Sequence, residues 1–296
     1  MRKLLSIFLL AGASSLAMAD SITPTSYSDS LAVGESATIT KTVTINQEIG
    51  GAVADVLFLF DTTGSMSPTI DTAKTQATAI MTGLAALGDF NFGVGRYDDF
   101  PTSPYGSPGD SPWTLEQNLT ATIGSAQTAI DGLVAVGGND DPESQLTALT
   151  AATTDVSWRE HSAKFIIWFG DQPGHEGTEA GYPGTATTAS TIAALAAVGD
   201  TGIIVNAINS GDLDATGQAT TITTASGGGL FTDTTDPADF VTLISDSITD
   251  VYQEYSEVCL NPHDNLPGVE VTSSPCYSGP FDRSVDRTFT FDVTFT

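Results

Sequence analysis

The sequence predicts an α/β domain with a doubly wound, mostly parallel sheet, inserted into a small β-sandwich that both flanks of the chain form. In the middle of the chain, short continuous apolar runs alternate with segments of helical spacing, which is typical of a parallel sheet covered by helices. Near both ends, apolar and polar residues alternate one by one, as in strands with one buried face. We therefore expect residues 51–257 to form the α/β domain, and residues 20–50 and 258–296 to form the two halves of the sandwich.

The first 19 residues have the pattern of a secretory signal peptide. A charged start with Arg2 and Lys3 precedes an apolar stretch, and Ala17-Met18-Ala19 matches a small-residue cleavage site. The apolar stretch is too short to span a bilayer, and no other segment is long enough to be a transmembrane segment. We therefore expect an exported protein, either secreted or at the cell surface, in an extracellular or periplasmic compartment.

The chain has two cysteines, Cys259 and Cys276. In an exported protein such a pair is expected to form a disulfide, and a buried pair of free thiols is the alternative. Their spacing is not that of a zinc site.

Three apolar runs predict buried strands at 56–60, 165–169 and 203–205. Apolar residues then recur every three or four positions over 70–87, with Ser67 as the helix N-cap and Pro68 as the first helical residue, and again over 240–255. Gly, Pro and Ser concentrate at 101–112 and 172–184, which we expect to be surface loops. In the flanks, residues 31–46 and 284–296 predict strands, the second with four apolar side chains from Phe289 to Phe295 on one face.

The charge of the chain excludes some classes of partner. There are 36 Asp and Glu residues against 9 Lys and Arg, which gives a formal net charge of −27. Such a chain is repelled by nucleic acid and by anionic lipid. Metal cations are the natural small partners of so acidic a surface.

The segment from Asp61 to Ser65 follows a predicted buried strand and precedes a predicted helix, which places it at the sheet edge where α/β domains bind ligands. A carboxylate at Asp61, with hydroxyls at Thr63 and Ser65, can point three oxygens at one centre. Oxygen ligands of low total charge favour a hard divalent cation, Mg²⁺ before Ca²⁺ or Mn²⁺.

Two more acidic residues are expected at this edge. Asp171 follows the strand at 165–169, and Glu143 follows the turn-rich run 137–142. Taken alone, Asp171 is an ordinary turn residue, and Asp141 before Pro142 is an ordinary helix N-cap. The convergence of Asp171 and Glu143 with Asp61 on one sheet edge favours a metal site.

The segment 61–67, Asp-Thr-Thr-Gly-Ser-Met-Ser, resembles the metal-ion-dependent adhesion site of von Willebrand factor type A (vWA) domains. The chain is similar in particular to the A-type domain of integrin β subunits, together with their hybrid domain, which is split by the A-type domain. Segments throughout the chain carry this closer resemblance: Val33 to Ser36, Phe92 to Tyr105, Asn139 to Glu143, Phe169 to Asp171, and the stretch around Cys259 and Cys276.

The resemblance implies two metal sites. Asp61, Thr63, Ser65 and Glu143 would hold Mg²⁺ or Mn²⁺ at the adhesion site, with Asp171 bound to the ion or next to its ligands. A neighbouring Ca²⁺ site would take Asp99, Asp140, the carbonyl of Pro142 and Glu143, and Asn139 would replace an asparagine that the family has one residue earlier. The acidic pair of a third family site is absent after the motif, where the chain has Ser67-Pro68-Thr69.

The resemblance also implies a function: the adhesion-site metal would bind a partner protein through an acidic side chain of that partner. A structural surface or matrix protein, in which metals only stabilise loops, is the alternative. An enzyme is the least favoured hypothesis, because no nucleophile or general base is identifiable by spacing. His175 lies four residues after Asp171, and we expect it to be a loop histidine.

Overall fold

The computed structural model of the chain describes residues 21–46, 52–160, 162–199, 201–232, 254–260, 270–282 and 285–296. They divide into two compact units, one from the middle of the chain and one from its two flanks, with divisions near residues 50 and 254. The expected signal peptide and most of the helix expected over 240–255 lie outside the described residues.

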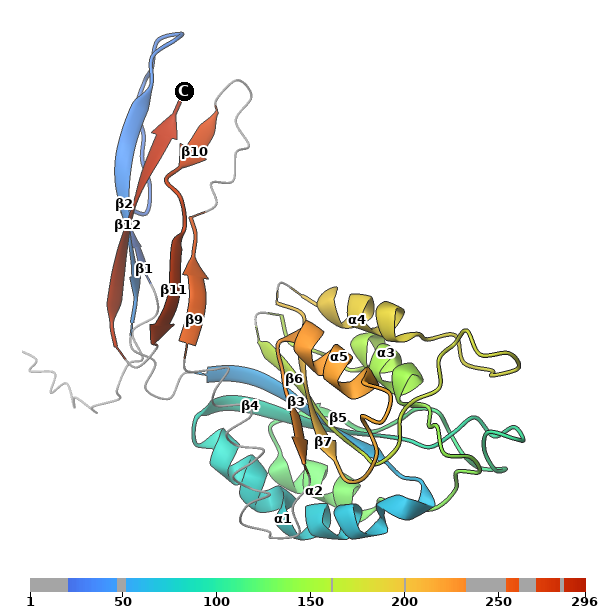
Figure 1. Ribbon diagram of the computed structural model, residues 1–296. Coiled ribbons are helices and arrows are strands. Elements are labelled where there is room, and N and C mark those ends of the chain that lie inside the picture. Colours follow the sequence, from blue (N-terminus) through green and yellow to red (C-terminus); the bar gives the residue numbers. More distant parts are fainter. Residues whose placement is uncertain are drawn as a thin grey trace, which may run out of the picture. The chain divides into compact units, whose positions relative to one another are not determined.

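The middle unit contains a six-stranded sheet in the order β5-β4-β3-β6-β7-β8 (Figure 1). All strands are parallel except β5, which runs antiparallel to β4. The strands are β3 (Ala52–Asp61), β4 (Gly88–Tyr97), β5 (Thr114–Thr120), β6 (Ala163–Gly170), β7 (Ile203–Asn209) and β8 (Leu230–Thr232). The expected doubly wound, mostly parallel sheet is confirmed.

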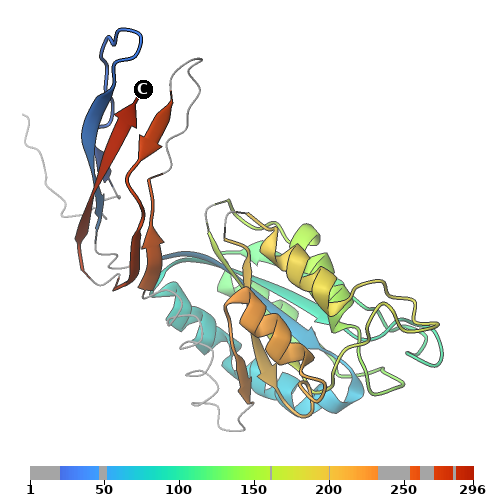
Figure 2. The same cartoon turned by 45° about the horizontal axis from the view of Figure 1, so that its top comes forward.

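Helices cover both faces of this sheet, which explains the continuous apolar runs. In β3, Val56, Phe58 and Phe60 pack into one core with α1 and α2, while Leu57 and Leu59 pack into another with α3, α4 and α5 (Figures 1 and 2). The helices are α1 (Ser67–Ala85), α2 (Ile123–Asp131), α3 (Gln145–Asp155), α4 (Thr188–Ala196) and α5 (Gln218–Ser226). Both faces of each central strand are therefore buried.

Three sequence predictions need correction. Helix α1 begins at Ser67, so its N-cap is Met66, which makes no side-chain capping bond because a short 3₁₀ turn, η1 (Gly64–Met66), leads directly into the helix. The same helix ends at Ala85, and Leu87 is exposed rather than part of the buried face. Tyr255 belongs to strand β9 (Glu254–Val258) and not to a helix, because β9 pairs with β11 (Tyr277–Asp282).

The flanks form an antiparallel unit of their own. Strand β2 (Ala37–Ile45) pairs with β12 (Arg287–Phe295) over nine residues, and β1 (Ser21–Thr23) and β10 (Val271–Ser273) complete a four-stranded sheet. Its inner side chains, including Phe289 and Phe291, pack against Val258 and Phe281 of the β9–β11 pair. The alternation of β12 thus has the predicted cause, although Phe295 at its end is only half-buried.

Cys259 and Cys276 form a disulfide within this unit, with their Cα atoms 4.4 Å apart. The pairing expected from the sequence is confirmed. In the part of the chain that the structure describes, no helix has the length and apolarity needed to cross a membrane.

Candidate metal site

The site is built on the carboxyl end of β3, between the ends of β4 and β6. Asp61 is the last residue of β3 and is fully buried. One of its carboxylate oxygens, Oδ1, accepts hydrogen bonds from the backbone N–H of Thr63 at 2.8 Å and from its hydroxyl at 2.7 Å. This short turn holds the carboxylate at the sheet edge and leaves Oδ2 without a hydrogen-bond partner.

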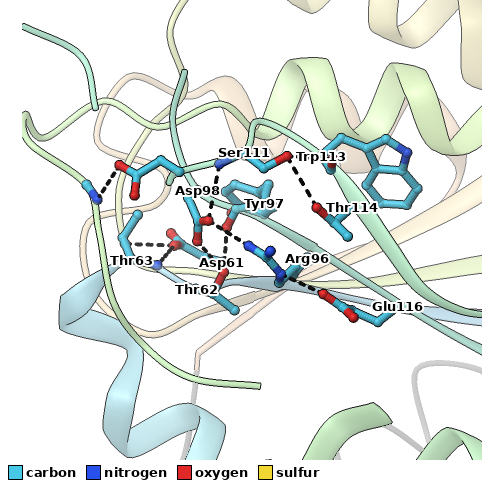
Figure 3. A network of polar contacts seen from close by, with 12 residues as sticks. Asp61, Thr62, Thr63, Arg96, Tyr97, Asp98, Ser111, Trp113, Thr114 and Glu116 are labelled. Carbon is cyan, nitrogen blue, oxygen red and sulfur yellow. Dashed lines mark hydrogen bonds and ion pairs between the residues drawn. The ribbon is translucent and has the colours of Figure 1, made fainter. Parts of the chain in front are cut away.

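A polar network fixes the same loop from the side of β4 (Figure 3). The Thr62 backbone N–H donates to the carbonyl of Tyr97 at 2.8 Å, and the Thr62 hydroxyl donates to the carboxylate of Asp98. Arg96 pairs at 2.7 Å with both Asp98 and Glu116. Arg96, near the end of β4, is thus paired with two acidic residues, and one of them, Asp98, orients the loop that follows Asp61.

The segment between α2 and α3 closes over this loop. Val136 N–H donates to the carbonyl of Thr62 at 2.8 Å, and Gly64 N–H donates to that of Gly137 at 3.3 Å. Gly138 has φ +76°, and a Cβ placed there would lie 3.2 Å from Thr63. A glycine is therefore needed both for the backbone conformation and for the close approach to Thr63.

Glu143 reaches the site through a backbone bridge. Its N–H donates to the carbonyl of Pro173 at 3.0 Å, and the N–H of His175 donates to the carbonyl of Glu143 at 3.0 Å. This pairing binds the segment before α3 to the loop that follows β6 and Asp171. The N-cap of α3 is Ser144, so the ordinary capping role considered for Asp141 is wrong.

Burial makes the carboxyl groups of this edge weaker acids than usual. It raises the pKa of Asp61 to about 8, and the charges of Asp171 and Asp98 add to the effect. Burial raises the pKa of Asp99 to about 6. The largest change is at Glu143, where burial and then the charges of Asp61 and Asp99 raise the pKa to about 11. Since nearby negative charges oppose one another, a cation at this edge would stabilise all three in the ionised form.

Several buried polar atoms at this edge have no hydrogen-bond partner. Among the described residues, seven buried side-chain atoms have no hydrogen-bond partner, and all seven lie at the end of β3, in the loops of this edge or at the start of α3. They are Asp61 Oδ2, Asp99 Oδ2, Asp140 Oδ1, Glu143 Oε2, Gln145 Oε1, Asp171 Oδ1 and His175 Nε2. Buried polar atoms are ordinarily paired, so such a concentration fits a site for cations and their bound water.

The arrangement also limits how an ion is held. In the described part of the chain, no three of these carboxyl and imidazole groups have ligand atoms that all lie within 4.8 Å of one another. Ligands about 2.1 Å from a Mg²⁺ ion lie at most about 4.2 Å apart. At most two of these groups therefore bind one ion directly, and hydroxyls and water supply the remaining positions.

The predicted adhesion-site residues meet at an open cleft of about 300 Å³, whose lining includes Thr63, Ser65, Asp140 and Glu143. Ser65 is exposed, and Asp171 is buried beside the cleft with one free oxygen. Asp61 lies under the loop that forms the cleft. The structure thus brings the predicted residues to one sheet edge, although the coordination itself stays a prediction.

The residues predicted to form the neighbouring Ca²⁺ site differ from one another in burial and in hydrogen bonding. The Asp99 and Asp140 carboxylates each keep a free buried oxygen. Pro142 is half-buried at the same turn. Asn139 is exposed, and its amide nitrogen donates to the carbonyl of Pro104 at 3.2 Å. These four ligands also stay a prediction.

Three residues of the site, Asp98, Asp110 and Gln145, were not expected there from the sequence. Asp110 accepts hydrogen bonds from the backbone N–H groups of Ser107 and Gly138, and so connects two loops of the site. Asp98 stands next to Asp99 at the end of β4, which is the signal that could have identified it. Nothing local distinguishes Asp110 or Gln145, because their partners are distant in sequence.

Comparisons with known proteins give partial matches to this chain. No family model matches the sequence. A stretch of 128 residues is 29% identical to alpha-protein kinase vwkA of Dictyostelium discoideum, over 42% of this chain but only 19% of that protein. The chain therefore spans about a fifth of the curated relative that it matches.

Three solved structures resemble the chain at low sequence identity. Proximal thread matrix protein 1 from the mussel byssus, solved with a zinc-occupied MIDAS (metal-ion-dependent adhesion site) motif, is 18% identical, with a TM-score of 0.47 over 69% of this chain and 48% of that one. The SpRpn10 VWA domain is 14% identical, with a TM-score of 0.43 over 67% and 95%. The pilus adhesin SpaC from Lactobacillus rhamnosus GG is 13% identical, with a TM-score of 0.48 over 88% and 41%. At these scores, the function has to be argued from the site.

Proposed function

We propose that this chain is an exported protein-recognition module that binds a divalent cation, Mg²⁺ or Mn²⁺, and through it an acidic side chain of a partner protein. The observation that carries the proposal is the set of unpartnered buried oxygens on Asp61, Glu143 and Asp171 at one sheet edge. Glu143 also lines the cleft there, together with the exposed Ser65. Buried carboxylates are costly without a cation, and the cleft gives a bound ion access to solvent.

Asp61, Thr63 and Ser65 would hold the ion, with Glu143 and Asp171 beside it. The bound metal supplies a positive centre with a coordination position that an external carboxylate oxygen fills. The Thr63 N–H and hydroxyl keep Asp61 Oδ1 in place, so that Oδ2 remains directed away from this turn. Asp98 fixes Thr62 from the other side. The chain therefore prepares the site before any ion binds.

Charge adds a condition on the partner. With a net charge of −27, the protein repels an acidic partner at long range, so attraction has to arise at the metal. The disulfide supports the exported location, because such bonds persist in oxidising compartments. The proposed role is recognition and not catalysis, and the finer likeness to integrin β subunits is part of this proposal.

The test is calorimetric titration of Mg²⁺ into the metal-stripped protein. We expect Asp61→Ala to abolish Mg²⁺ binding while near-ultraviolet and far-ultraviolet circular dichroism stay unchanged. Asp71→Ala is the matched control, because Asp71 is an exposed acidic residue on α1, ten positions further along the chain. Equal binding by all three proteins would mean only diffuse association with the acidic surface.

A second step tests the partner class. The Mg²⁺-loaded protein is applied to arrays of peptides that contain Asp or Glu, beside the same peptides with Asn or Gln. Binding that needs both Mg²⁺ and the peptide carboxylate supports recognition. Metal binding without any carboxylate dependence would instead favour a role in which the ion only stabilises the loops.

A further inference from the structure

His175 is placed by the backbone bridge that builds the site. Its N–H donates to the carbonyl of Glu143 at 3.0 Å, and the preceding residue, Gly174, forms a parallel bridge with Glu143. The imidazole is 4% exposed although it belongs to a loop. The loop is therefore tied to the segment that carries Asp140, and the ring lies against that carboxylate.

The ring has a fixed orientation. Its Nδ1 lies 2.7 Å from Oε2 of Glu179, and the ring stacks on Tyr182 with centroids 4.3 Å apart. Tyr105 meets it edge to face at 5.1 Å. The other Glu179 oxygen, Oε1, accepts a hydrogen bond from the backbone N–H of Glu176 at 2.6 Å. A carboxylate accepts hydrogen bonds, so this contact favours the ring tautomer whose proton is on Nδ1.

The other ring nitrogen, Nε2, then presents a lone pair. It is buried and has no hydrogen-bond partner, and it lies 3.3 Å from Oδ2 of Asp140. The second oxygen of Asp140 and Oδ2 of Asp99 are also buried and unpartnered. A lone pair that faces a carboxylate oxygen at this distance is repulsive unless a proton or a metal ion lies between them.

We infer that His175 Nε2 and the Asp140 carboxylate bind a borderline transition-metal ion such as Zn²⁺ or Cu²⁺, so that the neighbouring site is a nitrogen–oxygen site and not the all-oxygen Ca²⁺ site expected from the sequence. Two ligands about 2.1 Å from a tetrahedral zinc ion lie about 3.4 Å apart. The observed separation of 3.3 Å has this size. Glu179, on the far nitrogen, is the carboxylate that typically orients a metal-binding histidine.

The ligand types decide the class of metal. Imidazole suits Zn²⁺ and Cu²⁺, whereas Ca²⁺ takes oxygen ligands. In the described residues, no third acidic or imidazole group lies within 4.8 Å of both ligand atoms, so water would complete the coordination. The side chain of Asp140 is 29% exposed, which gives the ion a path from solvent.

The experiment titrates Zn²⁺ into chelator-treated full-length protein in the presence of excess Mg²⁺. We expect wild type and Asp61→Ala to bind Zn²⁺ alike, His175→Gln to bind it at least tenfold more weakly, and Glu179→Gln to bind it with intermediate affinity. His263→Gln, at one of the other two histidines of the chain, is the matched control and should bind as wild type does. Mg²⁺ binding should survive in His175→Gln and disappear in Asp61→Ala.

A spectroscopic measurement avoids dependence on the variants' folding. Electron spin echo spectra of the wild type loaded with Cu²⁺ in the presence of excess Mg²⁺ should show coupling to an imidazole nitrogen, and His175→Gln should lose it. Absence of that coupling in wild type would overturn the inference, as would unchanged Zn²⁺ affinity in His175→Gln. Either result leaves the proposed Mg²⁺ site intact, because that site is tested separately at Asp61.

Discussion

Glu143→Gln separates the cost of burying a carboxyl group from its use in binding a metal. Glu143 is 3% exposed, and burial with the charges of Asp61 and Asp99 raises its pKa to about 11. In the metal-free protein it is therefore protonated at pH 7 and donates a hydrogen bond to Asp99. The amide group of glutamine has the same shape and can donate the same bond.

The magnitude follows from proton linkage. In the unfolded chain, Glu143 ionises with its ordinary pKa of 4.5, so at pH 7 the unfolded state has lost a proton that the folded state keeps. The stability from this group is fully present below pH 4.5 and is lost as the pH rises toward the folded pKa. The 2.5 pH units between 4.5 and 7 correspond to about 3 kcal/mol. Metal-free Glu143→Gln should be more stable than wild type by up to that amount at pH 7, and equal to it near pH 4.

The assay is urea denaturation with a chelator or with Mg²⁺, followed by tryptophan fluorescence. All three tryptophans, Trp113, Trp158 and Trp168, lie in the middle unit, so the signal reports on the unit that contains the site. Mg²⁺ at 100 times its Kd adds about 2.7 kcal/mol to the wild type, and less to Glu143→Gln, so the gap between the two should narrow. Asp71→Asn, on the exposed face of α1, should change neither value by more than about 0.5 kcal/mol. A metal-free glutamine variant that is less stable than wild type at pH 7 would refute the reasoning, because Glu143 would then be ionised and paired.

Three further predictions concern the same two units. Mg²⁺ affinity should rise roughly tenfold per pH unit from pH 6 to about pH 8 and then rise less steeply, because binding has to ionise Asp61, whose pKa burial raises to about 8. Calorimetry in buffers of different ionisation enthalpy counts the protons released, and a flat profile would contradict the prediction. Gly138→Ala should lower Mg²⁺ affinity at least tenfold by displacing Thr63, whereas Gly217→Ala, at a similar φ of +74° with open space around it, should cost about 1 kcal/mol of stability without affecting the metal. Replacing both cysteines by serine should destabilise the flanking unit by about 3 kcal/mol, since it frees a loop with a sequence separation of 17; calorimetry should show unchanged Mg²⁺ binding, and a loss of binding would argue against the independence of the two units.

The central strands of the middle unit could be predicted because each has a continuous apolar run in its own sequence, which indicates burial on both faces. A run such as Val56 to Phe60 is apolar at every position, and both faces of β3 are indeed covered. The edge strands β5 and β8 were not predicted, since only one neighbouring strand pairs with each of them and their sequences are mixed. Helix ends were also less certain, because the start of α1 depends on the 3₁₀ turn before it and not on a capping side chain.

The candidate site could be predicted as far as sheet topology allows. Asp61, Asp99 and Asp171 each follow the end of a parallel strand, and β3, β4 and β6 are neighbours, so their convergence follows from topology alone. The position of His175 could not be predicted, because it depends on a backbone bridge between two loops. The same holds for Asp110, whose two hydrogen bonds join segments about 30 residues apart.

By itself, then, the sequence determined the two units, the parallel sheet, the disulfide and the edge at which the acidic residues collect. These features follow from local hydrophobic pattern and chain connectivity, which act on neighbouring residues or on whole strands. Only the tertiary structure decided which oxygen and nitrogen atoms are left unpaired in the buried edge, and how strongly each carboxyl group resists ionisation. Those properties depend on the loss of water and on charges that distant loops bring together, and no stretch of sequence contains that information.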